Sequence, residues 1–211
     1  MIAPVPEPAE PFPPGFFTRG DEGDDAGFYA PTRLVTHIDD HAIEQVGALY
    51  DELGVDGEVL DLMSSWVSHF RHPPARLTVL GMNERELAAN HVASVRVVHD
   101  LNADPLLPFA DATFDDAVCC VSVDYLTRPV EVFAEVARVL RPGGRLVCTF
   151  SNRVFPTKAI RGWLASDDEG RCEIVAEYFT RSGAFGPATI ERRTPVKWLG
   201  DPLFAVWATR T

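Results

Sequence analysis

The stretch PVEVFAEVARVLRPGGRLVCTF, residues 129–150, decides the fold. Its first part repeats apolar residues at spacings of three and four, which predicts a helix over residues 128–140 with one buried face. The following RPGG, residues 141–144, predicts a turn. Residues 145–150 form a continuous apolar run, which is typical of a strand covered on both faces. A helix that leads directly into such a strand predicts one unit of a parallel α/β sheet.

The same alternation extends to both sides of this stretch. An amphipathic helix is expected over residues 39–53, capped by Asp39 or Asp40 and ended by Gly54. A short helix is expected at residues 84–90. The other expected strands are residues 58–63, 76–80, 95–98, 116–123, 188–192 and 204–208. Together these elements predict an α/β fold with a mostly parallel seven-stranded sheet flanked by helices.

The N-terminal part of the chain has a different composition. Residues 1–14 contain six prolines, which predicts an extended arm, and residues 20–27 (GDEGDDAG) predict a polar loop. Phe12, Phe16 and Phe17 are too apolar for a free tail, so we expect them to lie against the domain surface. We therefore divide the chain into a proline-rich and acidic N-terminal arm, residues 1–30, and a domain, residues 31–211.

The net charge of −12 is concentrated near the N-terminus. Residues 1–60 hold 13 acidic and two basic residues, and the remainder of the chain is almost neutral. This balance argues against a nucleic acid or an anionic membrane as partner. The acidic residues are interpreted as a solvated face, with an attractive field for a cationic ligand as the alternative. A monomer or a homodimer is expected.

Targeting and metal-binding patterns are not found in the sequence. No apolar run approaches the roughly 18 residues of a membrane span, and the N-terminus does not resemble a signal peptide. The four cysteines fit neither a zinc pattern nor a disulfide framework. We therefore expect a cytoplasmic protein with reduced cysteines and no metal site.

Polar residues follow each of the first five strands. In an open parallel sheet, ligands bind beyond the carboxyl ends of the strands, so these residues are expected to line one crevice. The segments concerned are residues 61–65, 82–84, 100–102, 122–125 and 151–153.

The run from Val59 to Phe150 resembles the class I S-adenosylmethionine-dependent methyltransferases. The resemblance is carried by FDDAV, residues 114–118, and VFAEVARVLRPGG, residues 132–144, with LPF at residues 107–109. It implies a Rossmann-like class I methyltransferase fold, S-adenosyl-L-methionine as cofactor and a small-molecule acceptor. A narrower resemblance, to a methyltransferase-like group of unknown substrate with a glycine-poor first loop, rests on residues 60–69 and 151–159.

The resemblance also implies roles for residues at the strand ends. Asp61 is the family's acidic residue after the first strand, whereas Met63, Ser65 and Val67 stand where the family has glycines. Asn83 stands at the ribose position, with Glu84 next to it, and Asp100 at the adenine position. The expected cofactor-binding residues are Asp61, Met63, Ser64, Ser65, Met82, Asn83, Asp100, Leu101 and Ser122.

Structural roles are the alternative for these residues. Asp61 and Asp100 suit turns, and Ser64 and Ser65 suit a helix start. Asn83 suits a helix N-cap, because Glu86 follows three residues later as in a capping box.

Residues after the fourth and fifth strands are the candidates for the chemistry. Asp124 and Tyr125 are proposed as catalytic, and Tyr29, His37, Asn152 and Arg153 as acceptor-binding residues. Methyl transfer requires mainly proximity and orientation, and a general base only if the acceptor is protonated. His69 is placed on a helix after the first strand and interpreted as structural.

Two further expectations concern the surroundings of the site. By analogy with many relatives, residues 16–53 are expected to form a lid over the pocket mouth, with Tyr29, Arg33 or His37 at its edge. Lys158 is expected either to pair with a carboxylate or to bind an anionic substrate.

Two functions remain open from the sequence. The polar strand ends favour an S-adenosylmethionine-dependent methyltransferase acting on a small molecule. The missing glycines favour a non-catalytic protein of the same fold, a pseudoenzyme or scaffold, with weak or no cofactor binding.

Overall fold

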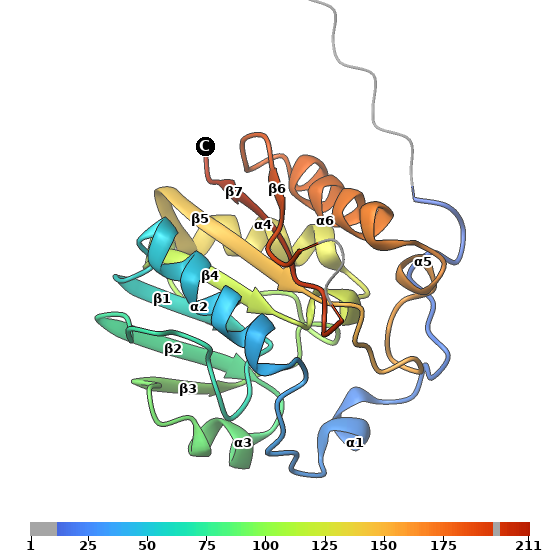
Figure 1. The fold of residues 1–211 in the computed structure, drawn as a ribbon, viewed down its shortest axis with the longest axis horizontal. Helices are drawn as coiled ribbons and strands as arrows, with labels where there is room; N and C mark the ends of the chain where they lie inside the picture. Colours follow the sequence, from blue (N-terminus) through green and yellow to red (C-terminus); the bar gives the residue numbers. More distant parts are fainter. Residues whose placement is uncertain (1–11, 196–198) are drawn as a thin grey trace, which may run out of the picture.

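A computed structural model describes residues 12–195 and 199–211 of the chain, so most of the proline-rich stretch lies outside the described residues. The core is a seven-stranded sheet in the order β3-β2-β1-β4-β5-β7-β6 (Figure 1). The strands are β1 (Glu58–Leu62), β2 (Arg76–Gly81), β3 (Val95–Val98), β4 (Phe114–Cys120), β5 (Leu140–Phe150), β6 (Thr189–Arg192) and β7 (Phe204–Thr209).

The sheet is mostly parallel, as expected. Strands β1 to β5 pair in parallel, and β7 pairs antiparallel with both β5 and β6. The carboxyl ends of β1 to β5 therefore meet at one edge of the sheet, which makes this edge the place to look for a ligand site.

Strands β4 and β5 differ from the expectation by more than one residue. Strand β4 ends at Cys120, and Val123 belongs to the short 3₁₀ helix η1 (Val123–Tyr125). The expected turn at residues 141–144 lies inside β5, because Gly143 adopts a left-handed φ of 82° and the pairing of β5 with β4 shifts register there. Gly143 and Gly144 keep hydrogen bonds to the backbone of Arg210, so the chain bulges without leaving the sheet.

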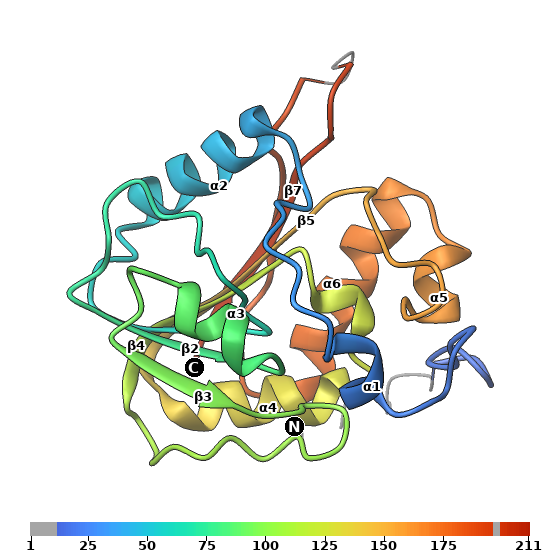
Figure 2. The same ribbon diagram turned by 90° about the horizontal axis from the view of Figure 1, so that it is seen from below.

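Helices cover both faces of the sheet. They are α1 (Asp25–Tyr29), α2 (Asp40–Leu53), α3 (Glu84–Ala89), α4 (Pro129–Val139), α5 (Arg161–Leu164) and α6 (Asp168–Ser182). Figure 2 shows α2 on one side of the sheet and α4 and α6 on the other. Each side encloses its own cluster of buried apolar residues, which explains why the central strands read as continuous apolar runs.

Helix α2 has the bounds that its sequence predicts. The Asp39 carboxylate accepts a hydrogen bond from the Ala42 amide at 2.8 Å, and Gly54 ends the helix with a left-handed φ of 65°. A side-chain cap and a C-terminal glycine satisfy backbone groups that a helix leaves unpaired at its ends.

Three α-helices, α1, α5 and α6, were not expected from the sequence. Helix α6 begins at an Asp167 cap and ends at Gly183, but its apolar stripe is weakly marked among many charged residues. Helix α1 forms at the end of the expected polar loop, where the Asp24 carboxylate accepts the Ala26 amide at 3.0 Å.

The helix expected after the first strand is absent. Residues 63–75 contain no helix, so His69 lies in a loop. The Ser64 and Ser68 hydroxyls donate to the Asp61 carboxylate, and the Ser64 amide donates to the Leu80 carbonyl at 2.8 Å. Serines that bond locally in this way compete with helical hydrogen bonding.

The described part of the N-terminal segment is packed on the domain. Phe12, Phe16 and Phe17 lie against the apolar cluster beneath α4 and α6, and both Phe12 and Phe17 contact the Tyr178 ring. This confirms the expectation for the three phenylalanines. The division of the chain at residue 30 stays a prediction.

Candidate functional site

A cavity of about 610 Å³ lies at the carboxyl ends of the parallel strands. Its volume is within the range of about 300–1,000 Å³ that small-molecule and cofactor sites usually have. The turns after β1, β2, β3 and β4 form its floor, together with residues 153–155 after β5. Residues from Asp25 to Asp39 form another wall, and we call residues 25–39 the wall segment.

Most residues singled out from the sequence line this cavity. They are Tyr29, His37, Asp61, Met63, Ser64, Ser65, Met82, Asn83, Asp100, Leu101, Ser122, Tyr125 and Arg153. The structure places Asp124 and Asn152 outside the lining. Tyr29, Arg33 and His37 thus lie at the cavity, whereas the role of this segment as a lid stays a prediction.

Asp61 is a buried carboxyl group at the cavity floor. The Ser64 hydroxyl donates to its Oδ2 at 2.6 Å, and the Ser68 hydroxyl donates to the same oxygen. Burial raises the pKa of Asp61 to about 6, although the two hydroxyl donors act in the opposite direction. A buried carboxyl group with a raised pKa in a cavity is a feature of functional sites.

Two neighbouring strand ends hold strained backbone. Met63 after β1 has a φ of 53°, and Val121 after β4 has a φ of 47°. Positive φ is unusual for residues with a side chain, above all for a β-branched one. Both residues line the cavity, and the Ser122 hydroxyl contacts the carbonyl oxygens of Met63 and Cys120. Met63 thus adopts the conformation for which the implied glycine pattern would use glycine.

Gly81 permits the loop after β1 to approach the end of β2. A Cβ atom at this position would lie 2.1 Å from the carbonyl oxygen of Ser64. The backbone of this loop is therefore pressed against β2 at the cavity floor.

Asn83 caps α3 and holds the wall segment. Its Oδ1 accepts the amides of Arg85 and Glu86, and its Nδ2 donates to the carbonyl oxygens of Tyr29 and Ala30. The helix-cap alternative is therefore confirmed. Every polar atom of the Asn83 side chain is engaged, so the carboxylate-like ribose acceptor implied by the resemblance is not available in this arrangement.

Glu86 is a cavity-lining carboxylate that the sequence reading did not assign to the site. It does not close a capping box, because its carboxylate accepts the Ser65 hydroxyl at 2.6 Å and the Arg33 amide at 2.7 Å. It therefore joins the loop after β1 to the wall segment. Glu84 is exposed and does not line the cavity.

Asp100 begins a turn after β3. Its Oδ1 accepts the amides of Asn102 and Ala103, which is the turn role left open as an alternative. Asn102 in turn donates to Asp25 of α1 and to the Tyr125 carbonyl, so this turn connects the wall segment to the end of β4.

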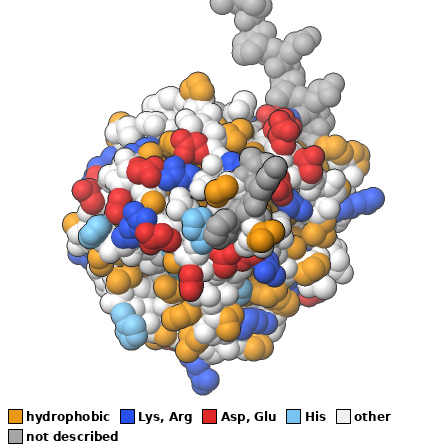
Figure 3. Space-filling view, in the orientation of Figure 1, with side chains coloured by type: hydrophobic (Ala, Val, Ile, Leu, Met, Phe, Trp, Pro, Cys, Tyr) orange, Lys and Arg blue, Asp and Glu red, His pale blue; other side chains and the backbone are white. Residues whose placement is uncertain are grey.

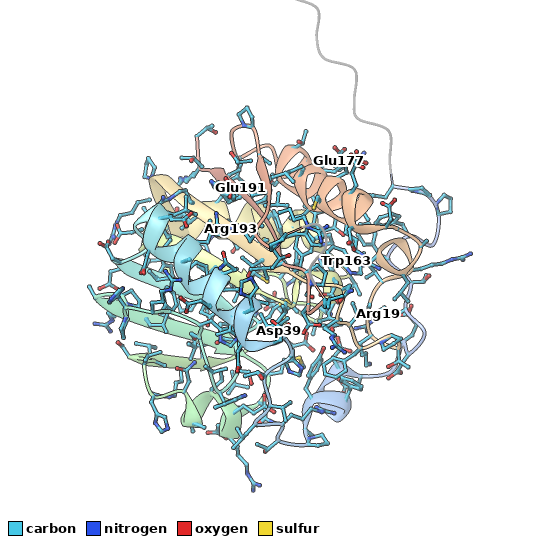
Figure 4. The ribbon with its side chains drawn as sticks, viewed as in Figure 1. Arg19, Asp39, Trp163, Glu177, Glu191 and Arg193 are labelled. Atoms are coloured by element: carbon cyan, nitrogen blue, oxygen red, sulfur yellow. The ribbon has the colours of Figure 1, made fainter. Side chains whose placement is uncertain are left out.

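A buried ion cluster anchors the wall segment. The Lys158 ammonium, which is fully buried, lies 2.9 Å from Asp25 and 3.0 Å from Asp21. Arg19 also pairs with Asp25 at 2.8 Å. In Figure 4, Arg19 lies near α5 and Asp39 at the start of α2. The carboxylate-partner interpretation of Lys158 is therefore confirmed.

Asp124 and Tyr125 occupy different environments although they are adjacent. Tyr125 lines the cavity, and its hydroxyl accepts the Phe155 amide at 2.9 Å. Asp124 is 2% exposed, and burial raises its pKa to about 7. One of its carboxylate oxygens has no hydrogen-bond partner among the described residues. Asp124 does not line the cavity, so the structure offers no direct contact between its carboxyl group and an acceptor bound there.

Comparison with known proteins agrees with this geometry. Residues 57–148 match the family described as "Methyltransferase domain". Over these residues the chain is similar to a methyltransferase domain. The fold is that of the class I S-adenosylmethionine-dependent methyltransferases, and the cofactor of this family is S-adenosylmethionine.

Two of the relatives each match less than half of the chain. A malonyl-[acyl-carrier protein] O-methyltransferase from Hahella chejuensis is 37% identical over 94 residues, which cover 41% of this chain and 33% of that protein. A ubiquinone/menaquinone biosynthesis C-methyltransferase from Paracoccus denitrificans is 38% identical over 96 residues, covering 41% and 37%. The chain thus spans about a third of the length of these relatives.

Solved structures extend the likeness to most of the chain. An S-adenosylmethionine-dependent methyltransferase from Aquifex aeolicus superposes with a TM-score of 0.57 at 15% identity, covering 82% of this chain and 95% of that one. One from Mesorhizobium loti gives a TM-score of 0.52 at 18% identity, covering 74% and 92%. At this identity the likeness concerns the fold.

The cavity has a volume that suits the cofactor, and an acidic residue is present where each of the two ends of the cofactor would lie. Its volume suits a nucleoside with a methionine tail, and the left-handed turn at Met63 beside Gly81 provides a close backbone approach. Asp61 would lie at the methionine end and Asp100 at the adenine end. At the ribose position, the acceptor oxygens of Asn83 and Glu86 are engaged by other residues.

A membrane-spanning helix and a metal-binding cluster are both absent from the described residues. These residues contain no helix that is both long and apolar enough to cross a membrane. They also contain no group of three or more histidine, cysteine or acidic residues placed to hold a metal ion. On the face seen in Figure 3, basic and acidic side chains are interspersed, which is unlike a continuous nucleic-acid-binding surface.

Proposed function

We propose that this chain transfers a methyl group from S-adenosylmethionine to a small molecule bound in the cavity. The observation that supports this most is that one cavity brings together Asp61, Asp100 and Tyr125 from the ends of three strands. The bound cofactor supplies an electrophilic methyl group on a sulfonium. The relatives are named as O- and C-methyltransferases, which supports methyl transfer and leaves the acceptor to be inferred from this cavity.

The residues of the chain would act by positioning and by excluding water. Asp61 would bind the methionine end of the cofactor, together with Ser65 and Ser122, and Asp100 would accept a hydrogen bond from the adenine end. Asn152 lies outside the lining, so acceptor contacts are proposed for Tyr29, His37, Tyr125 and Arg153. Holding the acceptor atom in line with the sulfonium can supply much of the rate enhancement.

Glu86 is the proposed ribose acceptor in place of Asn83. It lines the cavity next to the end of β2, and among the described residues its carboxylate accepts hydrogen bonds from one serine hydroxyl and one backbone amide. Ribose hydroxyls could replace the Ser65 hydroxyl as donors, since a carboxylate accepts several hydrogen bonds.

Calorimetry with S-adenosylhomocysteine tests the proposal. We expect measurable heat and a raised melting temperature, with affinity reduced about tenfold or more in Asp100→Ala and in Glu86→Gln, consistent with losing a charged hydrogen bond. Asp124→Asn is the matched control, since Asp124 does not line the cavity. Absence of heat and of thermal shift at high protein concentration would exclude the methyltransferase proposal.

A non-catalytic role is the second candidate. It is favoured by the glycine-free loop after β1 and by the engagement of Asn83 and Glu86 with the wall segment. In that case the wall segment would keep its protection from hydrogen exchange when S-adenosylhomocysteine is added, and no binding would be detected. A cofactor-binding enzyme should instead change the exchange of the Arg33 amide, which donates to Glu86.

A further inference from the structure

The carboxylates around the acceptor side of the cavity already have partners. Asp201 pairs with Arg153 at 2.7 Å, and Glu86 accepts from Ser65 and Arg33. Asp25 is held by Arg19 and Lys158. A cationic acceptor would therefore find no carboxylate without a partner among these residues. Breaking one of the existing ion pairs to bind it would cost free energy, because the displaced partner would be left buried and unpaired.

Arg33 is different, because no carboxylate of the described residues pairs with its cation. Among the described residues, none lies within 4.0 Å of its guanidinium, which donates instead to the carbonyl oxygens of Phe28 and Pro31. The guanidinium carbon lies 4.9 Å from the ring centre of Phe28 and 5.9 Å from that of Phe155. Arg33 lines the cavity, so this positive charge favours an anionic group there.

Aromatic side chains surround Phe155 on the same side of the cavity. The Phe155 ring lies 5.9 Å from the Tyr125 ring, 5.5 Å from the Phe28 ring and 5.4 Å from the His37 ring, measured between centres. Phe155, Tyr125, His37 and Tyr29 all line the cavity. Rings in such a wall prefer offset or edge-on contact with another planar ring, which favours an aromatic acceptor.

His37 adds a proton acceptor beside this wall. No hydrogen bond to the His37 or His69 ring is formed by the described residues, and both rings line the cavity. Burial lowers the pKa of both imidazoles, to about 4 for His69, where His37 adds to the effect. Glu86 and Arg33 are the charged groups facing His37, and they act in opposite directions. Both rings are therefore neutral near pH 7 and able to accept a proton.

We propose that the acceptor is an aromatic hydroxyl compound whose ring packs on Phe155 and whose oxygen lies between Arg33 and His37. This rests on the proposed function and names its substrate class. The hydroxyl proton moves to a ring nitrogen of His37, and Arg33 stabilises the phenolate. An oxygen lone pair then forms the O–CH₃ bond as the S–CH₃ bond of the methyl sulfonium breaks, leaving an aryl methyl ether, a neutral thioether and protonated His37.

The optical probe 4-nitrophenol tests the site without methyl transfer, because its phenolate absorbs visible light and the neutral phenol does not. At a pH where the free probe is mostly neutral, the protein should increase the phenolate band. An opposing charge within about 4–6 Å typically changes an ionisation constant by tenfold or more, so we expect about a tenfold change for the bound probe.

Variants separate the contributions to this signal. Arg33→Gln and His37→Gln should each remove most of the phenolate band, and Arg33→Lys should restore part of it if charge is the cause. Arg85→Gln and His91→Gln are matched controls, because both residues are exposed and neither lines the cavity. Melting temperatures recorded for all variants report whether each one folds.

The outcomes distinguish this inference from the proposed function. Binding of S-adenosylhomocysteine with no phenolate band, or with a band unchanged in Arg33→Gln, overturns the aromatic hydroxyl acceptor and leaves the methyltransferase proposal standing. An Arg33-dependent band without any binding of S-adenosylhomocysteine supports a phenolate site at Arg33 and contradicts the methyltransferase proposal. Displacement of 4-nitrophenol by the similarly sized cation 2-phenylethylamine, with equal affinity, would also overturn the proposal.

Discussion

Asn83 holds Tyr29 in place through its amide: Nδ2 donates to the Tyr29 carbonyl oxygen at 2.9 Å. The same nitrogen donates to the Ala30 carbonyl, while Oδ1 caps α3. One side chain therefore joins the turn after β2 to the wall segment, and both halves of the amide are needed for it.

Asn83→Asp should loosen the wall segment rather than tighten cofactor binding. A carboxylate still caps α3, but it has no donor for the two carbonyl oxygens and is repelled by them. We expect a loss of about 1–3 kcal/mol in the free energy of unfolding. Hydrogen exchange at the Arg33 amide should accelerate, because the Glu86 contact depends on the same segment.

Asn152→Asp is the matched amide-to-carboxylate control for this change. Asn152 is exposed and lies outside the cavity lining, so its variant should change neither unfolding nor exchange. Tighter S-adenosylhomocysteine binding in Asn83→Asp, with unaltered exchange, would instead support a ribose role for residue 83.

Lys158→Met should destabilise the chain by about 3–5 kcal/mol, the usual effect of removing one member of a buried ion pair. The methionine fills a similar volume, but Asp25 keeps only Arg19 and Asn102 as donors. Urea unfolding measures the loss. Arg76→Met is the control, because its pair with Glu58 is exposed and is worth less than about 1 kcal/mol.

The stability that this ion cluster contributes should decrease at low pH. Burial alone would raise the pKa of Asp25, but hydrogen bonds from Arg19, Asn102 and Lys158 outweigh burial and lower it. A lowered folded-state pKa contributes stability above the unfolded value of about 3.9, and this is lost as the pH falls through the folded pKa. In Lys158→Met, we expect unfolding to depend less on pH below about 4.

The elements of the sheet could be predicted because local signals and burial agree. Asp39 and Gly54 bound α2 in the sequence as they do in the structure. Helix α6 was missed because its charged residues interrupt the apolar repeat, although Asp167 and Gly183 mark its ends. The apparent turn at residues 141–144 misled because a bulge and a turn use the same residues, and only strand pairing distinguishes them.

The sequence predicts where the site lies but not which of its residues contact one another. Topology alone brings the strand ends together, which is why most of the expected residues line one cavity. The roles of Glu86 and Phe155 depend on contacts with the wall segment, which lies far from both in sequence. Arg33 lies within the wall segment, where no motif marks it. Asp124 lies outside the cavity lining although the adjacent Tyr125 belongs to it, since neighbouring residues of a 3₁₀ helix project in different directions.

Gly81→Ala should disturb the floor of the cavity. The added Cβ would meet the Ser64 carbonyl oxygen, so the loop after β1 must shift, which typically costs about 1–3 kcal/mol in a packed region. We expect weaker S-adenosylhomocysteine binding in calorimetry together with the lower stability. Gly27→Ala is the control: a Cβ there meets nothing within 4 Å, and α1 should gain about 0.5–1 kcal/mol. Equal effects of the two substitutions would contradict the close approach at Gly81.

Asp61→Asn should stabilise the fold at pH 8 while weakening cofactor binding. The folded-state pKa of Asp61 is about 6, above the unfolded value of about 3.9, so ionisation on raising the pH through this window costs stability. The amide resembles the protonated acid at every pH, and its oxygen can still accept from Ser64 and Ser68. We expect a gain on the order of 2 kcal/mol at pH 8, which decreases towards zero at pH 4.

Asp124→Asn separates stability from function in this experiment. Asp124 has a similarly raised pKa of about 7 but does not line the cavity, so its amide variant should also be more stable at pH 8. Of the two variants, only Asp61→Asn should reduce the affinity for S-adenosylhomocysteine, since Asp61 lines the cavity and Asp124 does not. Urea unfolding at pH 4 and pH 8, with calorimetry on the same samples, measures both effects. If both variants bind equally well, the Asp61 carboxylate serves the fold alone and the methionine end of the cofactor is held by other groups.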